Sequence, residues 1–474
     1  ELNVTFYPPL YLQRRMWVLE NLRAEGVTKV LDVGCGEGQL LAVLCQPAPW
    51  LTPPPTDILC PLPSTLSSST LTPPSPTYND EIPNLHPTTL VGIDLSTSDL
   101  AFAVQGTTPP QSEVNLDEGS DEYRSRLTNV GLRWEKLSVK VWKGGLEVVN
   151  EEFVDMECIV CTEVIEHLSP NILPAFAPTL LGIYHPRLFL VTTPSYTFNA
   201  RFISPGAPAS VRRGFLDPTA RTDRIFRHSD HKFEWTVDEF EVWCHETAEE
   251  WGYEVQVSSI GRALEIDEWG RDEELGGATS VAIFRRRDKS DREKRGRDVL
   301  KALALESEAH ELLAEHTHVP HPSAQKPKTL EEIGEGIRAT MEGFREAHMR
   351  VEELWFERDI AILCGGWIEL LVRAVEESEA LLLKRDGDEG KTRQDRGTWV
   401  VELVGGVTSP KDLWLSEGDK SIDYIPVDWI PGEGEKESSE DEWGGSTDME
   451  GDISWNGSDD EDDIARPESA AGWP

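Results

Sequence analysis

Alternating apolar runs and polar breaks divide the first 287 residues into predicted strands and helices. Residues 29–33 form a short β-branched run that leads into a glycine-rich turn, and residues 39–45 follow with a helical pattern. A strand, a glycine turn and a helix in this order open a doubly wound α/β domain. Residues 90–94 predict the second strand. Further apolar runs predict buried strands at 137–141, 157–161 and 187–191, and two late strands at 253–258 and 279–284.

A capping box marks the start of one later helix. Thr236 is the expected N-cap and Glu239 lies three residues further on, so a helix should run from there to about Trp251. Phe240 and Trp243 would lie on its apolar side. The loop before this helix should therefore end on a well-anchored element.

Other segments lack such patterning. Residues 47–89 are crowded with Pro, Ser and Thr and predict a disordered surface insertion. Residues 288–385 shift to charged helix formers and predict a helical charged extension. Residues 386–474 predict a mostly disordered acidic tail, since residues 431–474 alone carry 15 acidic and 2 basic residues. The catalytic domain would then span residues 1–287.

The predicted extension has its clearest helical patterning over residues 330–383. Apolar side chains fall near one face, and His348 interrupts that stripe. The stripe consists of Ile333, Ile337, Met341, Phe344 and Val351.

Composition narrows the class of protein. The chain of 474 residues has a formal net charge of −41, which argues against general coating of DNA or RNA but leaves room for a local basic cleft. Cys158 and Cys161 form a CxxC inside a predicted buried strand, so core packing is preferred over zinc binding. No signal peptide or membrane-spanning run is evident, and the expectation is an intracellular, cytoplasmic protein, with the nucleus left open.

The glycine turn carries the first candidate chemistry. Its pattern is Asp32-x-Gly34-x-Gly36-x-Gly38, and glycines let the backbone approach a ligand closely. Asp94 ends the second strand and can accept hydrogen bonds from ribose hydroxyls, with Ser96 just beyond it. The spacing differs from the GxGxxG of dinucleotide binders. It resembles the S-adenosylmethionine site of class I methyltransferases, which implies a Rossmann-like, mostly parallel, seven-stranded sheet.

A second group of polar residues follows the fourth predicted strand. Glu163, Glu166 and His167 would share one face of a helical turn at the carboxyl edge of the sheet. Carboxylate and imidazole ligands suit Mg²⁺ or Mn²⁺. Similar segments also occur in metal-free methyltransferases, where they shape the substrate pocket, so this segment alone leaves both interpretations open.

The segment 227–235, Arg-His-Ser-Asp-His-Lys-Phe-Glu-Trp, favours the metal. It has no evident structural need for two imidazoles so close together, and His231 would complete a set of two glutamates and two histidines with open positions for substrate oxygens. His228 or Asp230 could orient the ligands instead of binding the ion.

Together these motifs resemble the small RNA 2′-O-methyltransferases of the Hua enhancer type. The resemblance covers roughly residues 5–287, and residues 228–235 are its most specific part. Matching segments lie at 8–14, 31–38, 91–95, 163–167, 193–199 and 228–235. It implies metal roles for Glu163, Glu166, His167 and His231, and cofactor binding by the glycine loop and Asp94.

The resemblance also implies a substrate and a partner. Plant members carry double-stranded-RNA-binding domains that are not evident here, so the chain looks more like the short forms and the expected substrate is the 3′ end of a single-stranded guide RNA. An Argonaute- or Piwi-type protein is the expected delivery partner, and the enzyme is expected to be a monomer.

The expected reaction is transfer of a methyl group to the 2′-hydroxyl of the terminal nucleotide, which protects the RNA end. A divalent ion contacted by the 2′- and 3′-hydroxyls would lower the acidity barrier and align the 2′-oxygen with the sulfonium. His167 or His228 is the candidate proton acceptor.

Residues 201–232 hold 7 basic and 3 acidic residues, which favours phosphate contact. The candidate RNA contacts are Arg14, Tyr196, Phe198, Asn199, Arg224 and Arg227. Core packing is an equally good explanation for Tyr196 and Phe198.

Two other functions fit parts of the sequence. One is a metal-free class I methyltransferase acting on a small molecule. The other is a degenerate scaffold that acts through its C-terminal half, although Asp32, Gly34, Gly36 and Asp94 are all present, which speaks against decay.

Overall fold

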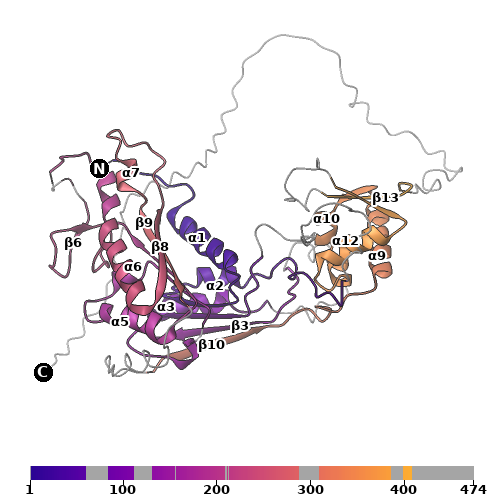
Figure 1. Ribbon diagram of the computed structural model, residues 1–474, viewed down its shortest axis with the longest axis horizontal. Helices are drawn as coiled ribbons and strands as arrows, with labels where there is room; N and C mark the ends of the chain where they lie inside the picture. Colours follow the sequence, from indigo (N-terminus) through magenta and orange to yellow (C-terminus); the bar gives the residue numbers. More distant parts are fainter. Residues whose placement is uncertain are drawn as a thin grey trace, which may run out of the picture.

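The computed structural model describes residues 2–59, 84–110, 131–154, 156–208, 211, 213–287, 309–385 and 399–407. These residues form a large α/β body and a smaller body that follows it in the chain (Figure 1). No helix in these ranges combines the length and apolarity needed to cross a membrane.

The large body is built on an eight-stranded sheet in the order β10-β3-β2-β1-β4-β5-β9-β8. Strands β3, β2, β1, β4 and β5 run parallel to one another, whereas β9 is antiparallel to β5 and to β8. The strands are β1 (Lys29–Val33), β2 (Thr89–Asp94), β3 (Leu137–Lys143), β4 (Cys158–Thr162), β5 (Leu188–Pro194), β8 (Tyr253–Ile260), β9 (Thr279–Arg286) and β10 (Glu311–His318).

Each face of this sheet is covered by helices because the central strands are apolar on both sides. Val30 packs on one face, against α1 and α2, while its neighbour Leu31 packs on the other, in a core that includes α6. This alternation is the two-residue period of a strand. The covering helices are α1 (Leu10–Ala24), α2 (Gln39–Leu44), α3 (Thr97–Gly106), α5 (Leu173–Ala177) and α6 (Val237–Trp251), with the π-helix η3 (Pro178–Tyr184).

Most predicted elements of this body are confirmed. Each predicted strand is present within a few residues of its expected bounds, and β8 and β9 form the expected antiparallel pair. Helix α6 begins at Thr236 with both hydrogen bonds of the capping box. The class I fold with a mostly parallel sheet is therefore confirmed, with one correction. The sheet has eight strands, because β10 adds to the outer edge of β3 in antiparallel register.

The range 288–385 is not the helical extension that its composition suggested. It contains β10, and it then forms a small α/β body whose core includes Ile337, Trp355 and Leu371. Its elements are α9 (Leu330–Phe344), β11 (His348–Arg350), α10 (Val351–Phe356), α11 (Arg358–Leu363), α12 (Ile368–Glu377), β12 (Leu381–Lys384) and β13 (Val400–Leu403). The predicted apolar stripe of residues 333–351 is also interrupted in the structure. Phe344 is half exposed, and His348 lies on strand β11 and not on a helix.

Two predicted disordered regions contain ordered residues. Strand β13 lies within the predicted tail, where it pairs with β11 and β12. In the predicted insertion, Leu51 is buried and its N–H bonds to the carbonyl of Gly366 at 2.8 Å. The carbonyl of Pro49 accepts the indole N–H groups of Trp134 and Trp355. These segments lack periodicity but pack through aromatic and backbone contacts. Residues 60–83 of the insertion and 408–474 of the tail lie outside the described residues.

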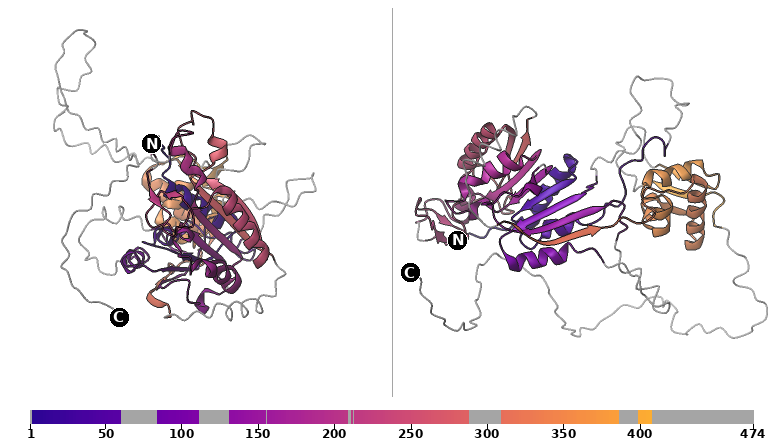
Figure 2. Two further views of the ribbon diagram at one scale, coloured as in Figure 1. Left: turned by 90° about the vertical axis from the view of Figure 1, so that its left-hand side faces the viewer. Right: turned by 90° about the horizontal axis from the view of Figure 1, so that it is seen from below.

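Short elements complete the large body. Those near the carboxyl edge of the sheet are η2 (Ile165–His167), η4 (Thr197–Phe202), the hairpin of β6 (Phe215–Leu216) and β7 (Ile225–Phe226), and α7 (Asp272–Leu275), while η1 (Glu151–Phe153) precedes β4. Figure 1 shows β6 projecting from the large body on the side away from the small body, and Figure 2 shows β10 running along the sheet toward that small body.

Candidate metal and cofactor site

The glycine loop after β1 has the backbone that its sequence predicts. Gly34, Gly36 and Gly38 all adopt positive φ, at 72°, 50° and 74°. A Cβ on Gly34 would lie 2.3 Å from Cγ2 of Val164, and one on Gly38 would lie 2.7 Å from Ala103, whereas one on Gly36 would meet nothing within 4 Å. Gly34 and Gly38 are therefore required by packing. Gly36 instead borders open space at the carboxyl edge of the sheet, where α/β proteins bind ligands.

Two acidic side chains adjoin this loop. Asp94 accepts hydrogen bonds from the N–H groups of Gly36, at 2.8 Å, and Ser96, at 2.9 Å. Asp32 is buried, and this burial together with the nearby Asp94 carboxylate raises the pKa of Asp32 to about 7. A ligand that brings positive charge and hydroxyl donors would match this pair. Ser96 was predicted to contact the cofactor, and in the structure its hydroxyl caps α3 by accepting the N–H of Asp99.

The candidate metal ligands meet at the carboxyl end of β4. Buried Ile165 anchors η2, and potential ligand atoms of Glu166, His167 and His231 all lie within 4.8 Å of one another. His231 comes from the loop after β7, and the N–H of Lys232 holds that loop in place by donating to the carbonyl of Glu166 at 2.7 Å. The structure therefore brings together three of the four predicted ligands from two distant segments.

An unsatisfied oxygen lies in this group. Glu166 is fully buried, and its Oε2 accepts a hydrogen bond from Thr193 at 3.0 Å, while its Oε1 has no hydrogen-bond partner among the described residues. Burial and the neighbouring Glu163 carboxylate raise the pKa of Glu166 well above its ordinary value. An orphaned buried carboxylate oxygen is costly. A bound cation would satisfy it, so these residues fit a divalent ion with mixed oxygen and nitrogen ligands.

The imidazoles are prepared for such a role. Nδ1 of His231 lies 2.7 Å from Oε1 of the buried Glu234, which leaves Nε2 for a ligand. Burial and the nearby rings of His231 and His228 lower the pKa of His167, which favours the neutral form that binds metals.

Glu234 is the main functional candidate that sequence reasoning missed. Its carboxylate also accepts hydrogen bonds from the Asn199 amide at 2.7 Å and from the N–H of Arg227 at 3.1 Å. A carboxylate that orients a ligand histidine is a common feature of metal sites. The available signal was the three-residue spacing from His231 to Glu234, but an acid at that spacing is equally consistent with an exposed side chain.

Glu163 occupies a different position from the other three predicted ligands. Its carboxylate accepts a hydrogen bond from Thr192 at 2.8 Å and forms an ion pair with Arg14 at 3.2 Å. It lies outside the three-residue group but close enough to influence Glu166. Its backbone has a positive φ of 55°, an uncommon conformation for a residue other than glycine that turns the chain sharply after β4. Its role as a ligand stays a prediction.

His228 is the more accessible of the two candidate proton acceptors. Its side chain is half exposed, and its ring centroid lies 5.2 Å from that of His231 and 6.2 Å from that of His167. Its Nδ1 accepts the N–H of Asp230 at 3.3 Å. His167 belongs to the three-residue group, so a proton-accepting role suits His228 better.

Several predicted RNA contacts are instead engaged within the protein. Phe198 is only 3% exposed and packs between Phe6 and Phe202, so stacking on an RNA base is wrong for this ring. Arg224 forms a two-pronged ion pair with Glu239, and its guanidinium lies 4.7 Å from the ring centroid of Tyr196. Phosphate contact by Arg224 therefore stays a prediction, and in this arrangement its guanidinium is engaged by Glu239.

The remaining predicted contacts have internal partners too. The Arg14 guanidinium reaches Glu163 and Thr279, the Asn199 amide holds Glu234, and the Arg227 guanidinium covers the ring of Phe202 at 3.7 Å. These side chains support the site. Sequence reasoning found the correct neighbourhood, but it could not show which side chains already had partners.

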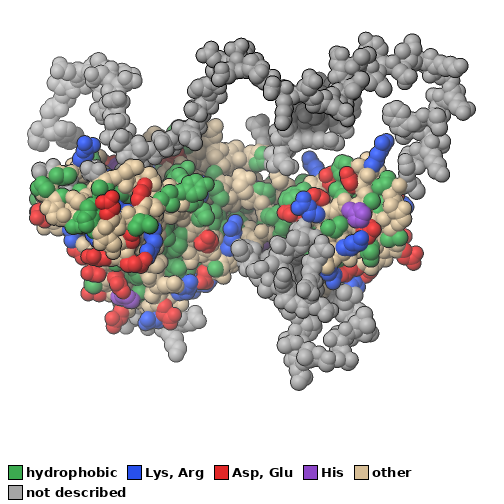
Figure 3. All heavy atoms as spheres, turned by 90° about the horizontal axis from the view of Figure 1, so that it is seen from above, with side chains coloured by type: hydrophobic (Ala, Val, Ile, Leu, Met, Phe, Trp, Pro, Cys, Tyr) green, Lys and Arg blue, Asp and Glu red, His purple; other side chains and the backbone are tan. Residues whose placement is uncertain are grey.

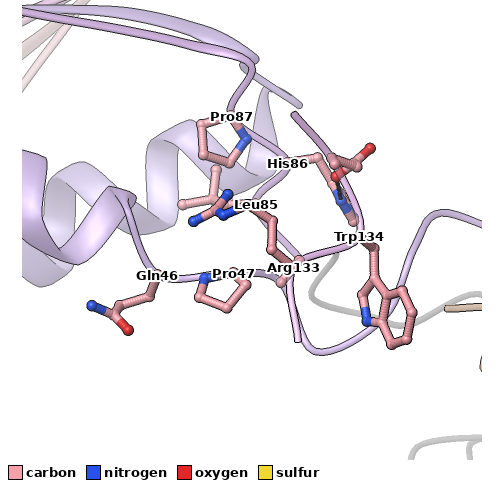
Figure 4. Close-up of a pocket in the computed structure, with 9 residues that line it drawn as sticks. Gln46, Pro47, Leu85, His86, Pro87, Arg133 and Trp134 are labelled. Carbon is pink, nitrogen blue, oxygen red and sulfur yellow. Dashed lines mark hydrogen bonds and ion pairs between the residues drawn. The ribbon is translucent and has the colours of Figure 1, made fainter. Parts of the chain in front are cut away.

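A separate pocket lies away from these groups, between the large body and the start of the insertion (Figure 4). Its volume is about 10 Å³, which is room for one water molecule at most. His86 pairs with Glu135 at 2.6 Å beside it, and Arg133 donates to the carbonyl of Cys45. The pocket is too small for a substrate. Its polar groups hold together the two ends of the insertion and residues 133–135.

The curated proteins to which this chain is similar include small RNA 2′-O-methyltransferases of several organisms. The chain is 27% identical over 284 residues to a small RNA 2′-O-methyltransferase of Arabidopsis thaliana, which covers 59% of this chain and 23% of that protein. It is 26% identical over 293 residues to one of Drosophila melanogaster (61% and 57%) and 24% identical over 290 residues to one of Schizosaccharomyces pombe (59% and 61%). The aligned regions thus span less than two thirds of each of these relatives. No family model matches the chain.

Solved structures similar to this chain include two that are named as Hen1 proteins. The crystal structure of the small RNA methyltransferase HEN1 aligns with 67% of this chain and 29% of that chain, at 23% identity and a TM-score of 0.42. The methyltransferase domain of a bacterial Hen1 aligns with 59% of this chain and 99% of that chain, at 24% identity and a TM-score of 0.36. The curated relatives confirm the resemblance that the motifs carried.

Proposed function

We propose that this chain, a homologue of the small RNA 2′-O-methyltransferases, uses S-adenosylmethionine to methylate the 2′-hydroxyl of the 3′-terminal nucleotide of a small RNA, in a reaction that depends on a divalent metal. The observation that carries the metal dependence is the buried Oε1 of Glu166, which lies beside His167 and His231 and has no hydrogen-bond partner among the described residues. The curated relatives support methylation of small RNA, and the terminal specificity and the metal are this proposal's own additions.

The chain's residues divide into a cofactor side and a metal side. The open space beside Gly36, with Asp32 and Asp94 next to it, suits a ligand that carries ribose hydroxyls and a positive charge, as S-adenosylmethionine does. Val164 packs against Gly34 and joins this loop to the segment that carries Glu166. The cofactor site and the candidate metal site are therefore adjacent. Methyl transfer requires this, because the donor sulfonium and the acceptor hydroxyl must lie close together.

Glu166, His167 and His231 would hold Mg²⁺ or Mn²⁺, with Glu163 nearby as a second acid. A divalent ion bound there would supply Lewis acidity toward the vicinal hydroxyls of a terminal ribose. Glu234 fixes the orientation of the His231 ring, and Asn199 and the backbone of Arg227 fix Glu234. His228 is close enough to this group to accept the proton that the hydroxyl loses.

The test uses the full chain with labelled S-adenosylmethionine and three synthetic RNAs of one sequence. One ends in ribose, one in 2′-deoxyribose and one in 3′-deoxyribose. We expect labelling of the first alone, its loss in EDTA and its recovery with added Mn²⁺ or Mg²⁺. Full labelling in EDTA would remove the metal from the proposal. Labelling of the 2′-deoxy RNA would remove the 2′-hydroxyl as the acceptor.

A further inference from the structure

The hairpin of β6 and β7 leads directly into the candidate metal site. Strand β7 ends at Phe226, and the chain continues through Arg227 and His228 to His231. Figure 1 shows the hairpin projecting from the large body near the carboxyl edge of the sheet. A polymer whose end lies beside His231 would therefore have this hairpin close to its preceding units.

The hairpin is held rigid from within. One oxygen of the Asp217 carboxylate accepts hydrogen bonds from the N–H and hydroxyl of Thr219, at 2.7 and 2.6 Å, and the other accepts those of Thr222, at 3.0 and 2.7 Å. These contacts lower the pKa of Asp217, although its burial opposes them. The turn is thus fixed, although two short strands alone would be marginally stable.

The base of the hairpin is anchored to the large body. The Arg224 guanidinium pairs with Glu239 on α6 through two hydrogen bonds of 2.8 Å and donates to the carbonyl of Glu234 at 2.9 Å. The Arg227 guanidinium lies over the ring of Phe202. Arg224 and Arg227, both predicted RNA contacts, therefore hold the hairpin in a fixed position relative to the candidate metal site.

This rigid frame presents apolar side chains to solvent. Phe215 is 50% exposed and Leu216 is 73% exposed, whereas Phe226, the cross-strand partner of Phe215, is 1% exposed. An aromatic ring held half exposed on a short, pre-formed hairpin gains nothing for stability from that exposure. It provides a flat face on which a base can stack.

A cation lies in the same hairpin. Arg221 is exposed, and its Nε donates to Thr219 at 3.0 Å, which fixes the direction of the side chain. Its terminal nitrogens make no hydrogen bond to any of the described residues. On the face drawn in Figure 3, the visible acidic and basic side chains are interspersed. A local cationic contact of this kind can bind a phosphate of a polyanion.

We propose that the hairpin over residues 213–226 is an arm that binds single-stranded RNA a few nucleotides before its 3′ end, upstream of the last three nucleotides. Phe215 stacks on a base, and Arg221 contacts a phosphate. This inference rests on the proposed function and adds to it a requirement for unpaired nucleotides next to the 3′ end. A pre-formed aromatic and cationic contact is the usual means by which proteins bind single strands without reading their sequence.

The test compares a trinucleotide with an unpaired RNA of about 20 nucleotides as methyl acceptors. Phe215→Ala should raise KM for the longer RNA by about tenfold, with kcat unchanged, because stacking contributes to binding and not to chemistry. The KM of the trinucleotide should change far less. Phe215→Trp should restore the wild-type KM, since it keeps a flat ring.

Matched variants control for general effects. Phe102→Ala removes a ring of similar exposure on α3 and should leave both KM values unchanged. Arg221→Ala should reduce the salt dependence of binding, lowering the slope of log affinity against log salt by about 0.7. Arg338→Ala, at an exposed position on α9, should leave that slope unchanged.

Each other result overturns the inference. Equal KM values for both RNAs in the wild-type protein would mean that nothing beyond the terminal nucleotides is bound. A fall in kcat in Phe215→Ala would mean that the hairpin supports the metal group and not the RNA. An effect seen only with protein-bound RNA would assign the arm to a protein partner. Absence of methylation with every RNA would instead reject the proposed function.

Discussion

The cofactor loop and the metal group lie side by side but are built in opposite ways. The loop of Gly34, Gly36 and Gly38 owes its shape to missing side chains, and one of its positions borders open space. The candidate metal site of Glu166, His167 and His231 owes its shape to side chains from two segments, joined by the hydrogen bond from Lys232 to Glu166. Adding a side chain should therefore impair the glycine loop, whereas removing a ligand side chain should impair the candidate metal site.

The largest effect should come from removing a candidate metal ligand. His231→Ala should lower the rate of methyl transfer by about 10³-fold or more, because a bound metal supplies several kcal/mol of transition-state stabilisation. Affinity for S-adenosylmethionine should stay within a few-fold of wild type. Single-turnover assays and calorimetry measure the two quantities. A large loss of cofactor affinity in this variant would show that the cofactor loop and the candidate metal site do not act independently.

A weaker effect on the same half should follow the loss of an orienting residue. Glu234→Ala frees the His231 ring and should reduce metal affinity by about 10- to 100-fold, since partners of ligand histidines contribute on that scale. Excess Mn²⁺ should restore much of the activity. Manganese titration followed by electron paramagnetic resonance reads the affinity directly. If high Mn²⁺ does not restore activity, Glu234 does more than orient the histidine.

Two variants of the glycine loop distinguish a local effect on cofactor binding from an effect that also reaches the candidate metal site. Gly36→Ala should weaken cofactor binding by about tenfold, because an alanine at positive φ costs roughly 1–2 kcal/mol and its methyl group enters the open space. Metal affinity should not change. Gly34→Ala should reduce both affinities, since its Cβ would collide with Val164 next to Glu163. If Gly34→Ala spared the metal, the proposed contact between the halves would be unimportant.

The smallest effect should be a pH dependence on the cofactor side. The pKa of Asp32 is raised to about 7, so its carboxyl group is protonated below that pH and ionised above it. Binding of a cationic cofactor favours the ionised form, and affinity should therefore fall as pH drops through about 7. The expected change between pH 8 and pH 6 is about tenfold or less. Calorimetry across this range should show a flat profile in Asp32→Asn, and a flat wild-type profile would contradict the role of Asp32.

The sequence predicted backbone features better than side-chain partners. Val30 and Leu31 identify a strand buried on both faces, and the glycine spacing identifies the loop, because both depend on local patterns. His231 was found because two histidines close together are unusual. The sequence left Phe198 open between base stacking and core packing, and the structure places it in the core against Phe6. It could not show that Arg224 pairs with Glu239, because the sequence does not reveal the partner of a guanidinium.

The small body escaped prediction for a related reason. Its core depends on residues that come together only in three dimensions, such as Leu51 from the insertion, Trp134 before β3 and Trp355 in α10. No local period reveals such contacts. The two hydrogen bonds from Trp134 and Trp355 to the carbonyl of Pro49 also hold a segment whose composition suggested disorder.

The eighth strand has a practical consequence for anyone shortening this protein. Strand β3 carries Leu137, Val139 and Val141, all fully buried, and β10 pairs along its outer side over nearly its full length. A chain cut at residue 287, where the catalytic pattern ends, would leave that side of β3 with unpaired backbone groups, which are a template for self-association. Expression trials should therefore retain residues through His318, and shorter versions should precipitate even though every candidate ligand is present.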